Sequence, residues 1–149
     1  MKIYAYISVV VLILTGCSAS ATGIEQNISQ LEQSIHVEGN SLLMKNCKLY
    51  RVHDEEKELL YNFDDYQSCF LMQDSGKVRL FNTQSGMVVP LGISRDKLDY
   101  CETWGFSLLV EKTRIAISTH YYSRKQCSDF KWPEKPFHVL ATEVLDLPA

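Results

Sequence analysis

The sequence predicts a mainly β protein, a small antiparallel β-sandwich or barrel-like domain with a short N-terminal helix, stabilised by disulfides. From Ser41 onward about eight short apolar runs follow one another, separated by Gly, Pro, Asp, Asn and Ser. Several of these runs alternate between apolar and polar residues, which is the period of a half-buried strand. Of the 149 residues, 46% are hydrophobic, which is enough for a single core.

The first 16 residues have the features of a secretory signal peptide. Lys2 supplies a positive charge, residues 3–14 are almost wholly apolar, and the small residues Thr15 and Gly16 follow. The apolar run of about a dozen residues is too short for a membrane span, which needs roughly 20. We therefore expect residues 1–16 to be an export signal that is removed.

The motif Leu14-Thr15-Gly16-Cys17 resembles the lipobox of bacterial lipoproteins. This resemblance covers only the first 17 residues. It implies that Cys17 carries diacylglycerol and an N-acyl chain such as palmitate, and two or more acyl chains anchor a protein stably. In the enterobacterial members, Asp after the cysteine favours the inner membrane, so Ser18 implies the periplasmic face of the outer membrane.

With Cys17 assigned to lipid, an even set of cysteines remains. An exported domain meets an oxidising compartment, so we expect disulfides. Several connectivities are open, and we favour Cys47–Cys69 with Cys101–Cys127, because each closes a moderate loop between neighbouring elements. A zinc site is the alternative use, but the sequence has none of the close CxxC or HxxxH pairs typical of one.

Residues 17–40 are predicted to form a lipidated tether with a short helix. Residues 18–23 are small and flexible by composition. The helix is expected over 24–35, because apolar residues recur there at helical spacing, at Ile24, Ile28, Leu31 and Ile35. Residues 41–149 then form one periplasmic domain.

The charge of the mature chain argues against nucleic acid as a partner. Loss of Lys2 with the signal peptide changes the formal net charge from −3 to −4. The charges are scattered and form neither a basic patch for nucleic acid nor a polybasic cluster for anionic lipid. The membrane is therefore expected to be a partner through the lipid anchor alone.

Turn signals and alternation place the strands of the domain. Gly76 supplies a turn between two apolar runs, and Pro90 is expected at a sheet edge or strand end. A short helical segment is expected within 94–104, and a proline-bounded loop at 131–136. The predicted strands are 41–52, 57–63, 68–73, 77–82, 87–91, 105–111, 113–122 and 137–144, of which 105–111 and 113–122 form the strongest pair.

No motif for catalysis is found in the sequence. It has no GxSxG elbow, HExxH, Walker loop or GxGxxG fingerprint. We therefore predict no catalytic residue, no metal site and no cofactor other than the lipid on Cys17.

Aromatic composition favours a binding role instead. The chain has 8 Tyr and 2 Trp, and these residues are favoured at protein interfaces. The stretch 121–136 combines basic residues, aromatics and prolines and is the predicted exposed face, whereas Trp104, beside Cys101, is expected in the core. The candidate binding residues are His120, Tyr121, Tyr122, Arg124 and Trp132.

Three functions are compatible with these features. The first is a non-enzymatic lipoprotein that binds a protein partner in the envelope, as immunity and inhibitor proteins do; this rests on an analogy of architecture. The second is an envelope-assembly or quality-control lipoprotein whose excess triggers envelope stress signalling. The third is a small envelope hydrolase that uses His120 with a carboxylate.

The lipid anchor gives a direct prediction. Replacing the acceptor thiol, Cys17→Ala, removes the acyl chains and should release the protein from membranes, as measured by fractionation and by metabolic labelling with palmitate. A Ser18→Ala change should leave both readouts intact. A Cys17→Ala protein that still fractionated with the outer membrane would contradict the model.

Overall fold

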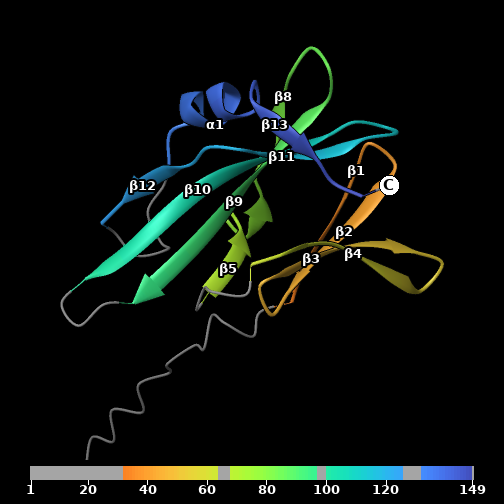
Figure 1. Ribbon diagram of the computed structural model, residues 1–149, viewed down its shortest axis with the longest axis horizontal. Coiled ribbons are helices and arrows are strands. Elements are labelled where there is room, and N and C mark those ends of the chain that lie inside the picture. The colour runs from red at the N-terminus through yellow and green to blue at the C-terminus, as the bar shows by residue number, and fades with distance from the viewer. Residues whose placement is uncertain (1–31, 64–67, 97–99, 126–131, 149) are drawn as a thin grey trace, which may run out of the picture.

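Two antiparallel sheets pack face to face in this protein (Figure 1). The structure is a computed structural model that describes residues 32–63, 68–96, 100–125 and 132–148. The predicted mainly β, antiparallel class is confirmed. The lipobox and Cys17 lie outside the described residues.

The first sheet, sheet A, is a simple meander of consecutive strands. Each strand pairs with the next through a tight turn, and residues at these turns take positive φ values, including Gly39, Asn46 and Asp54. Its strands are β1 (Gln33–Val37), β2 (Asn40–Lys45), β3 (Lys48–His53) and β4 (Glu56–Asn62), in that spatial order.

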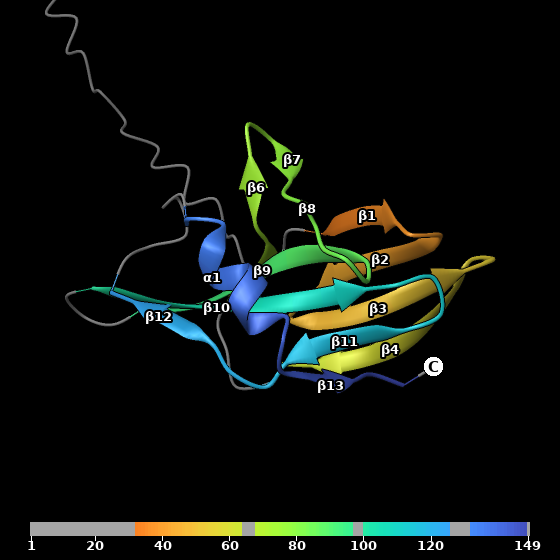
Figure 2. The same cartoon turned by 90° about the horizontal axis from the view of Figure 1, so that it is seen from above.

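The second sheet, sheet B, is built around the long pair β9 and β10. Its order is β13-β11-β10-β9-β5, and β8 and β12 add short pairings to β9 and β10. A separate small hairpin, β6 with β7, projects from the body (Figure 2). The bounds are β5 (Ser68–Leu71), β6 (Gln73–Asp74), β7 (Lys77–Val78), β8 (Phe81–Asn82), β9 (Met87–Asp96), β10 (Cys101–Val110), β11 (Ile115–Ser118), β12 (Tyr122–Arg124) and β13 (Val144–Asp146).

Sheet B is covered on both faces. One face packs on sheet A, and the other packs under helix α1 (Lys135–Leu140), which lies on the side of β9 and β10 away from sheet A (Figure 1). Strands covered on both faces are apolar at consecutive positions, as in β11, where all four residues are buried. The core against sheet A includes Val89, Leu91, Ile93, Leu108 and Val110, and the core under α1 includes Phe70, Val88, Leu109, Trp132, Phe137 and Leu140.

Strand β5 joins the two sheets. Its Cys69 forms a disulfide with Cys47, in the turn between β2 and β3, which confirms the predicted pair. Two residues further on, the Leu71 N–H donates to Gln33 Oε1 at 2.7 Å, and Gln33 Nε2 donates to the Leu71 carbonyl at 3.2 Å. On the side of β5 away from β9, the buried amide of Gln33 thus makes the two backbone hydrogen bonds that a neighbouring strand would otherwise make. We call these two links, the disulfide and the Gln33–Leu71 pair, the β5 clamp.

Two glycines make room for aromatic rings beneath α1. Gly92 in β9 pairs with Gly105 in β10. A Cβ atom on Gly92 would stand 2.3 Å from the ring of Phe70, and one on Gly105 would stand 3.3 Å from the ring of Phe137 and 3.4 Å from that of Trp132. The glycines therefore allow all three rings to approach the sheet closely.

The predicted position of Pro90 is wrong, because this residue lies in the middle of β9, between other strands of the sheet. The Pro90 carbonyl accepts the Met72 N–H at 2.9 Å, so its backbone atoms face the side of β5 and β8. On that side β5 ends opposite Leu91 and β8 starts opposite Val88. Proline is tolerated here because its missing N–H faces the gap between these two short strands.

The predicted last strand, 137–144, is also wrong, since residues 135–140 form α1. Pro136 stands in the first turn of this helix, where its missing N–H costs nothing. Phe137 and Leu140, three positions apart, are the buried residues of α1 and anchor it on sheet B. The expected helical segment within 94–104 is absent from its described residues, which belong to β9 and β10 except for Tyr100, just before β10.

Other predicted strand and helix boundaries differ from those in the structure. The predicted strand 41–52 is two strands, because the chain turns at Asn46 and Cys47. Of the predicted hairpin over 68–82, the turn at Ser75-Gly76 is confirmed, but β5 and β8 pair with β9 rather than with each other. Residues 33–35 of the expected N-terminal helix belong to β1, and residues 24–31 lie outside the described part of the chain.

The glycine pair gives a graded prediction for stability. Gly92→Ala should lower the free energy of unfolding by about 1–3 kcal/mol, because the new methyl group overlaps the Phe70 ring, and Gly105→Ala should cost less. Urea unfolding measures both. Adding Phe70→Leu to Gly92→Ala should cost less than the sum of the two single changes. Fully additive costs would show that the ring does not set the constraint.

Candidate functional site

The ends of β9 and β10 extend beyond sheet A, together with β12 (Figures 1 and 2). β12 lies against the first half of β10, with Trp104 opposite Ser123 and Gly105 opposite Tyr122. The chain that follows β11 is therefore held against β10 by strand pairing.

Exposed tyrosines and two cations gather on this extension. Tyr100 is 43% exposed, Tyr121 55% and Tyr122 39%, and Arg124 and Lys125 are also exposed. We call these five residues the tyrosine ledge. Tyrosine offers a large, rigid contact surface with a hydroxyl group at its end, which is the profile of an interface residue.

Both cations of the tyrosine ledge lie over aromatic rings. Arg124 Cζ is 5.4 Å from the centroid of Trp132, and Lys125 Nζ is 5.3 Å from that of Tyr100. Each distance falls within the roughly 6 Å at which cation–π attraction acts. The positive charges are thereby held in place beside the exposed tyrosines.

A row of rings connects the tyrosine ledge to sheet A. Tyr121 lies 5.6 Å from Phe106, Phe106 lies 6.3 Å from Phe63, and Phe63 lies 4.5 Å from Tyr61, all between ring centroids. Phe63 is buried, whereas Tyr61, on the edge strand β4, is 36% exposed. The row fixes the ring of Tyr121 against the rest of the domain.

His120 has a carboxylate partner. Its Nδ1 lies 3.1 Å from Glu143 Oε2 and 3.0 Å from Thr119 Oγ1, and the side chains of His120 and Glu143 are 70% and 69% exposed. A pair this open to water is screened and contributes little to stability. The nearby Ser118 hydroxyl has a structural role: it donates to the His120 carbonyl and accepts the Ser107 N–H.

The structure brings together four of the five predicted binding residues. His120, Tyr121, Tyr122 and Arg124 lie on one exposed connection. Trp132 contacts Arg124 but is no part of the exposed surface, since it is 3% exposed and packs over Gly105. Trp104 is partly buried and packs against the core, and residues 126–131 of the predicted face lie outside the described chain.

Tyr100 and Glu143 were missed from the sequence. Tyr100 precedes β10, and its meeting with Lys125 depends on the β10–β12 pairing. Glu143 approaches His120 because its carbonyl accepts the Thr119 N–H at 2.9 Å. Both contacts depend on strand pairing between distant segments, and no local motif marks them.

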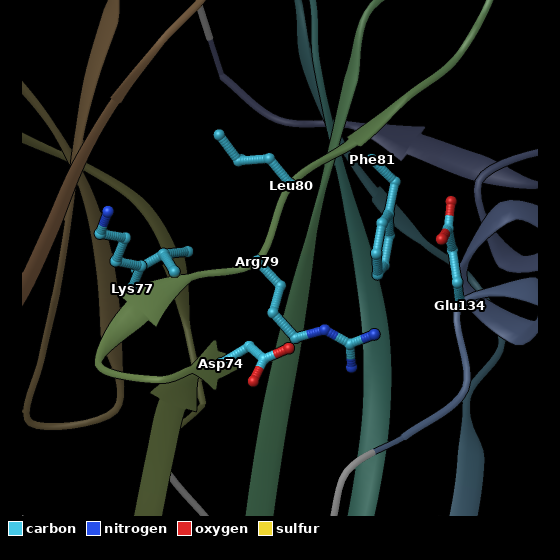
Figure 3. Close-up of a pocket in the computed structure, with 7 residues that line it drawn as sticks. Asp74, Lys77, Arg79, Leu80, Phe81 and Glu134 are labelled. Atoms are coloured by element: carbon cyan, nitrogen blue, oxygen red, sulfur yellow. The ribbon is translucent and has the colours of Figure 1, made fainter.

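A second feature is an open hollow of about 420 Å³ beside the β6–β7 hairpin (Figure 3). It lies between that hairpin, the segment leading into β8, and Glu134 just before α1. Its walls carry both charge signs, from Lys77 and Arg79 and from Asp74 and Glu134.

Nothing in the described chain gathers metal ligands: no group of three or more His, Cys, Asp or Glu side chains lies there in a position to hold an ion. Cys101 is disulfide-bonded, but its expected partner Cys127 lies outside the described residues.

Among the described segments, no helix is long and apolar enough to cross a membrane.

The pKa shifts belong to ion pairs away from the tyrosine ledge. A hydrogen bond from Lys45 lowers the pKa of Glu32, and one to Asp146 raises the pKa of Arg114. All four of these side chains are substantially exposed, so the pairs add little stability.

Comparison with known proteins gives no relative. No protein-family model, no curated protein and no solved structure matches this chain.

Proposed function

We propose that this protein is a non-enzymatic binding protein of the bacterial envelope, anchored by lipid on Cys17, that holds a protein partner on the tyrosine ledge. The observation that carries the proposal is the set of three exposed tyrosines beside two cations that rings hold in place. The partner is taken to be a toxin or hydrolase that attacks the envelope, so the role is that of an immunity or inhibitor protein.

The contacts that hold the tyrosine ledge in place favour a role in binding. Binding loses affinity when mobile side chains must be ordered, so a surface ordered beforehand binds more tightly. Here Tyr122 belongs to a strand paired with β10, Tyr121 rests on Phe106, and Lys125 lies over Tyr100. These contacts order the surface before a partner arrives.

The lipobox supports the location. A lipid on Cys17, with Ser18 after it, would hold the domain at the periplasmic face of the outer membrane. Tethering confines the domain to the surface where an attacker must pass, and confinement raises the effective concentration of the inhibitor there.

One observation favours a second function. His120 Nδ1 lies 3.1 Å from Glu143 Oε2. A hydrolase could use a histidine oriented by a carboxylate in this way as its general base. The two functions predict different behaviour for His120, which lies next to the tyrosine ledge.

The tyrosine ledge should therefore be tested by capture of a partner. The mature protein should capture one stoichiometric protein from envelope extract, identified by mass spectrometry. Tyr121→Ala with Tyr122→Ala should weaken that complex by about 30-fold, equivalent to about 2 kcal/mol, because hot-spot tyrosines carry such energies.

Two matched variants serve as controls. Leu145→Ala removes an apolar side chain that is 58% exposed on β13 and should leave capture unchanged. His120→Ala should also preserve it. The proposal would be overturned if the double tyrosine change left capture unaffected. It would also be overturned if the protein had a hydrolytic activity that His120→Ala abolished, and that result would favour the hydrolase.

A further inference from the structure

The hollow beside the β6–β7 hairpin shares no lining residue with the tyrosine ledge, so a ligand bound there is independent of the proposed function. Its volume of about 420 Å³ lies within the range of roughly 300–1,000 Å³ typical of small-ligand sites. The hairpin stands out from the body (Figure 2), and the segment that follows it forms one wall of the hollow (Figure 3).

Arg79 is held in place at this hollow. Its Nη1 donates to the Trp132 carbonyl at 2.7 Å, and its Cζ lies 4.9 Å from the centroid of the Phe81 ring. Its own N–H donates to the Met72 carbonyl at 2.8 Å. Both ends of this arginine are thus fixed before any ligand arrives.

The guanidinium retains donors for a ligand. It presents several N–H groups in a planar fork that matches a carboxylate. Within the described part of the chain, this group donates one hydrogen bond, to the Trp132 carbonyl. In Figure 3 the guanidinium reaches below the Phe81 ring.

The described lining of the hollow carries charges of both signs. Lys77 and Arg79 are positive, and Asp74 and Glu134 are negative. Glu134 is bonded to His138, with Oε1 2.7 Å from Nε2, which fixes that carboxylate on the wall. A dianion such as phosphate would meet repulsion from both carboxylates, whereas a ligand with one charge of each sign would complement the site.

The remaining lining is apolar. Val78 and Leu80 belong to the wall, and Leu80 is 38% exposed.

We propose that this hollow binds a short peptide with free ends. Arg79 receives the terminal carboxylate in a charge-assisted, two-point contact, and the carboxylate of Glu134 faces the terminal ammonium group. Val78 and Leu80 contact the side chains of the peptide.

The probes for this proposal are small and chemically matched. The full-length protein in detergent is titrated with L-alanyl-L-alanine and followed by the backbone amide resonances of Arg79, Leu80 and Glu134. The same titration uses L-alanyl-L-alanine amide, which lacks the carboxylate, N-acetyl-L-alanyl-L-alanine, which lacks the ammonium group, and inorganic phosphate.

The dipeptide should shift these resonances saturably, and the amide should bind about tenfold more weakly, the effect of losing a charge-assisted contact. The acetylated dipeptide should also bind more weakly. Phosphate should not compete. No saturable shift with the dipeptide, equal affinity for its amide, or tighter binding of phosphate would each overturn the proposal.

Variants locate the contact. Arg79→Lys keeps the charge but lacks the planar fork, so dipeptide affinity should fall while the rest of the spectrum stays in place. Lys112→Leu removes an exposed cation in the turn after β10 and should leave the affinity unchanged. An Arg79→Lys protein with the affinity of the original would overturn the assignment of Arg79.

Discussion

The β5 clamp is the interaction on which the rest of the structure depends. Sheet A and sheet B are separate hydrogen-bonded units, and β5 belongs to sheet B through its pairing with β9. On its other side, Cys69 is bonded to Cys47, and Leu71 exchanges two hydrogen bonds with the side chain of Gln33. This short strand therefore fixes how the two sheets face each other.

The effects of the clamp reach the surface through a few contacts. Phe70, between the two clamped residues, lies over Gly92, whose partner across the strands is Gly105. Gly105 in turn leaves room for the ring of Trp132. Trp132 then serves both sites, because its ring lies under Arg124 of the tyrosine ledge and its carbonyl holds Arg79 at the hollow.

Trp132 shows where reasoning from sequence succeeds and where it fails. Its neighbourhood of prolines, basic residues and aromatics indicated an exposed face, and Tyr121, Tyr122 and Arg124 of that stretch are exposed. The residue itself is buried, because Gly105, distant along the chain, makes room for its ring. Local composition locates such a region, but exposure depends on the partner that the fold supplies.

Periodicity has the same limits for the secondary structure. The β10–β11 pair and the Ser75-Gly76 turn could be predicted, because alternation and turn chemistry are local. In residues 137–144 the apolar positions suit a strand as well as a helix, and Pro136 as a helix start decides between them. The gap that accommodates Pro90 and the bridge from Gln33 to Leu71 exist only in the assembled sheets.

The most direct test of this account is the unfolding free energy of Gln33→Leu, together with hydrogen exchange at the Leu71 amide. The substitution leaves the N–H and carbonyl of Leu71 without their partners, so stability should fall by about 1–3 kcal/mol and the Leu71 amide should lose protection. Ser34→Ala, at an exposed position of the same strand, should change neither. A Gln33→Leu protein within about 0.5 kcal/mol of the original, with Leu71 still protected, would contradict the central role of the clamp.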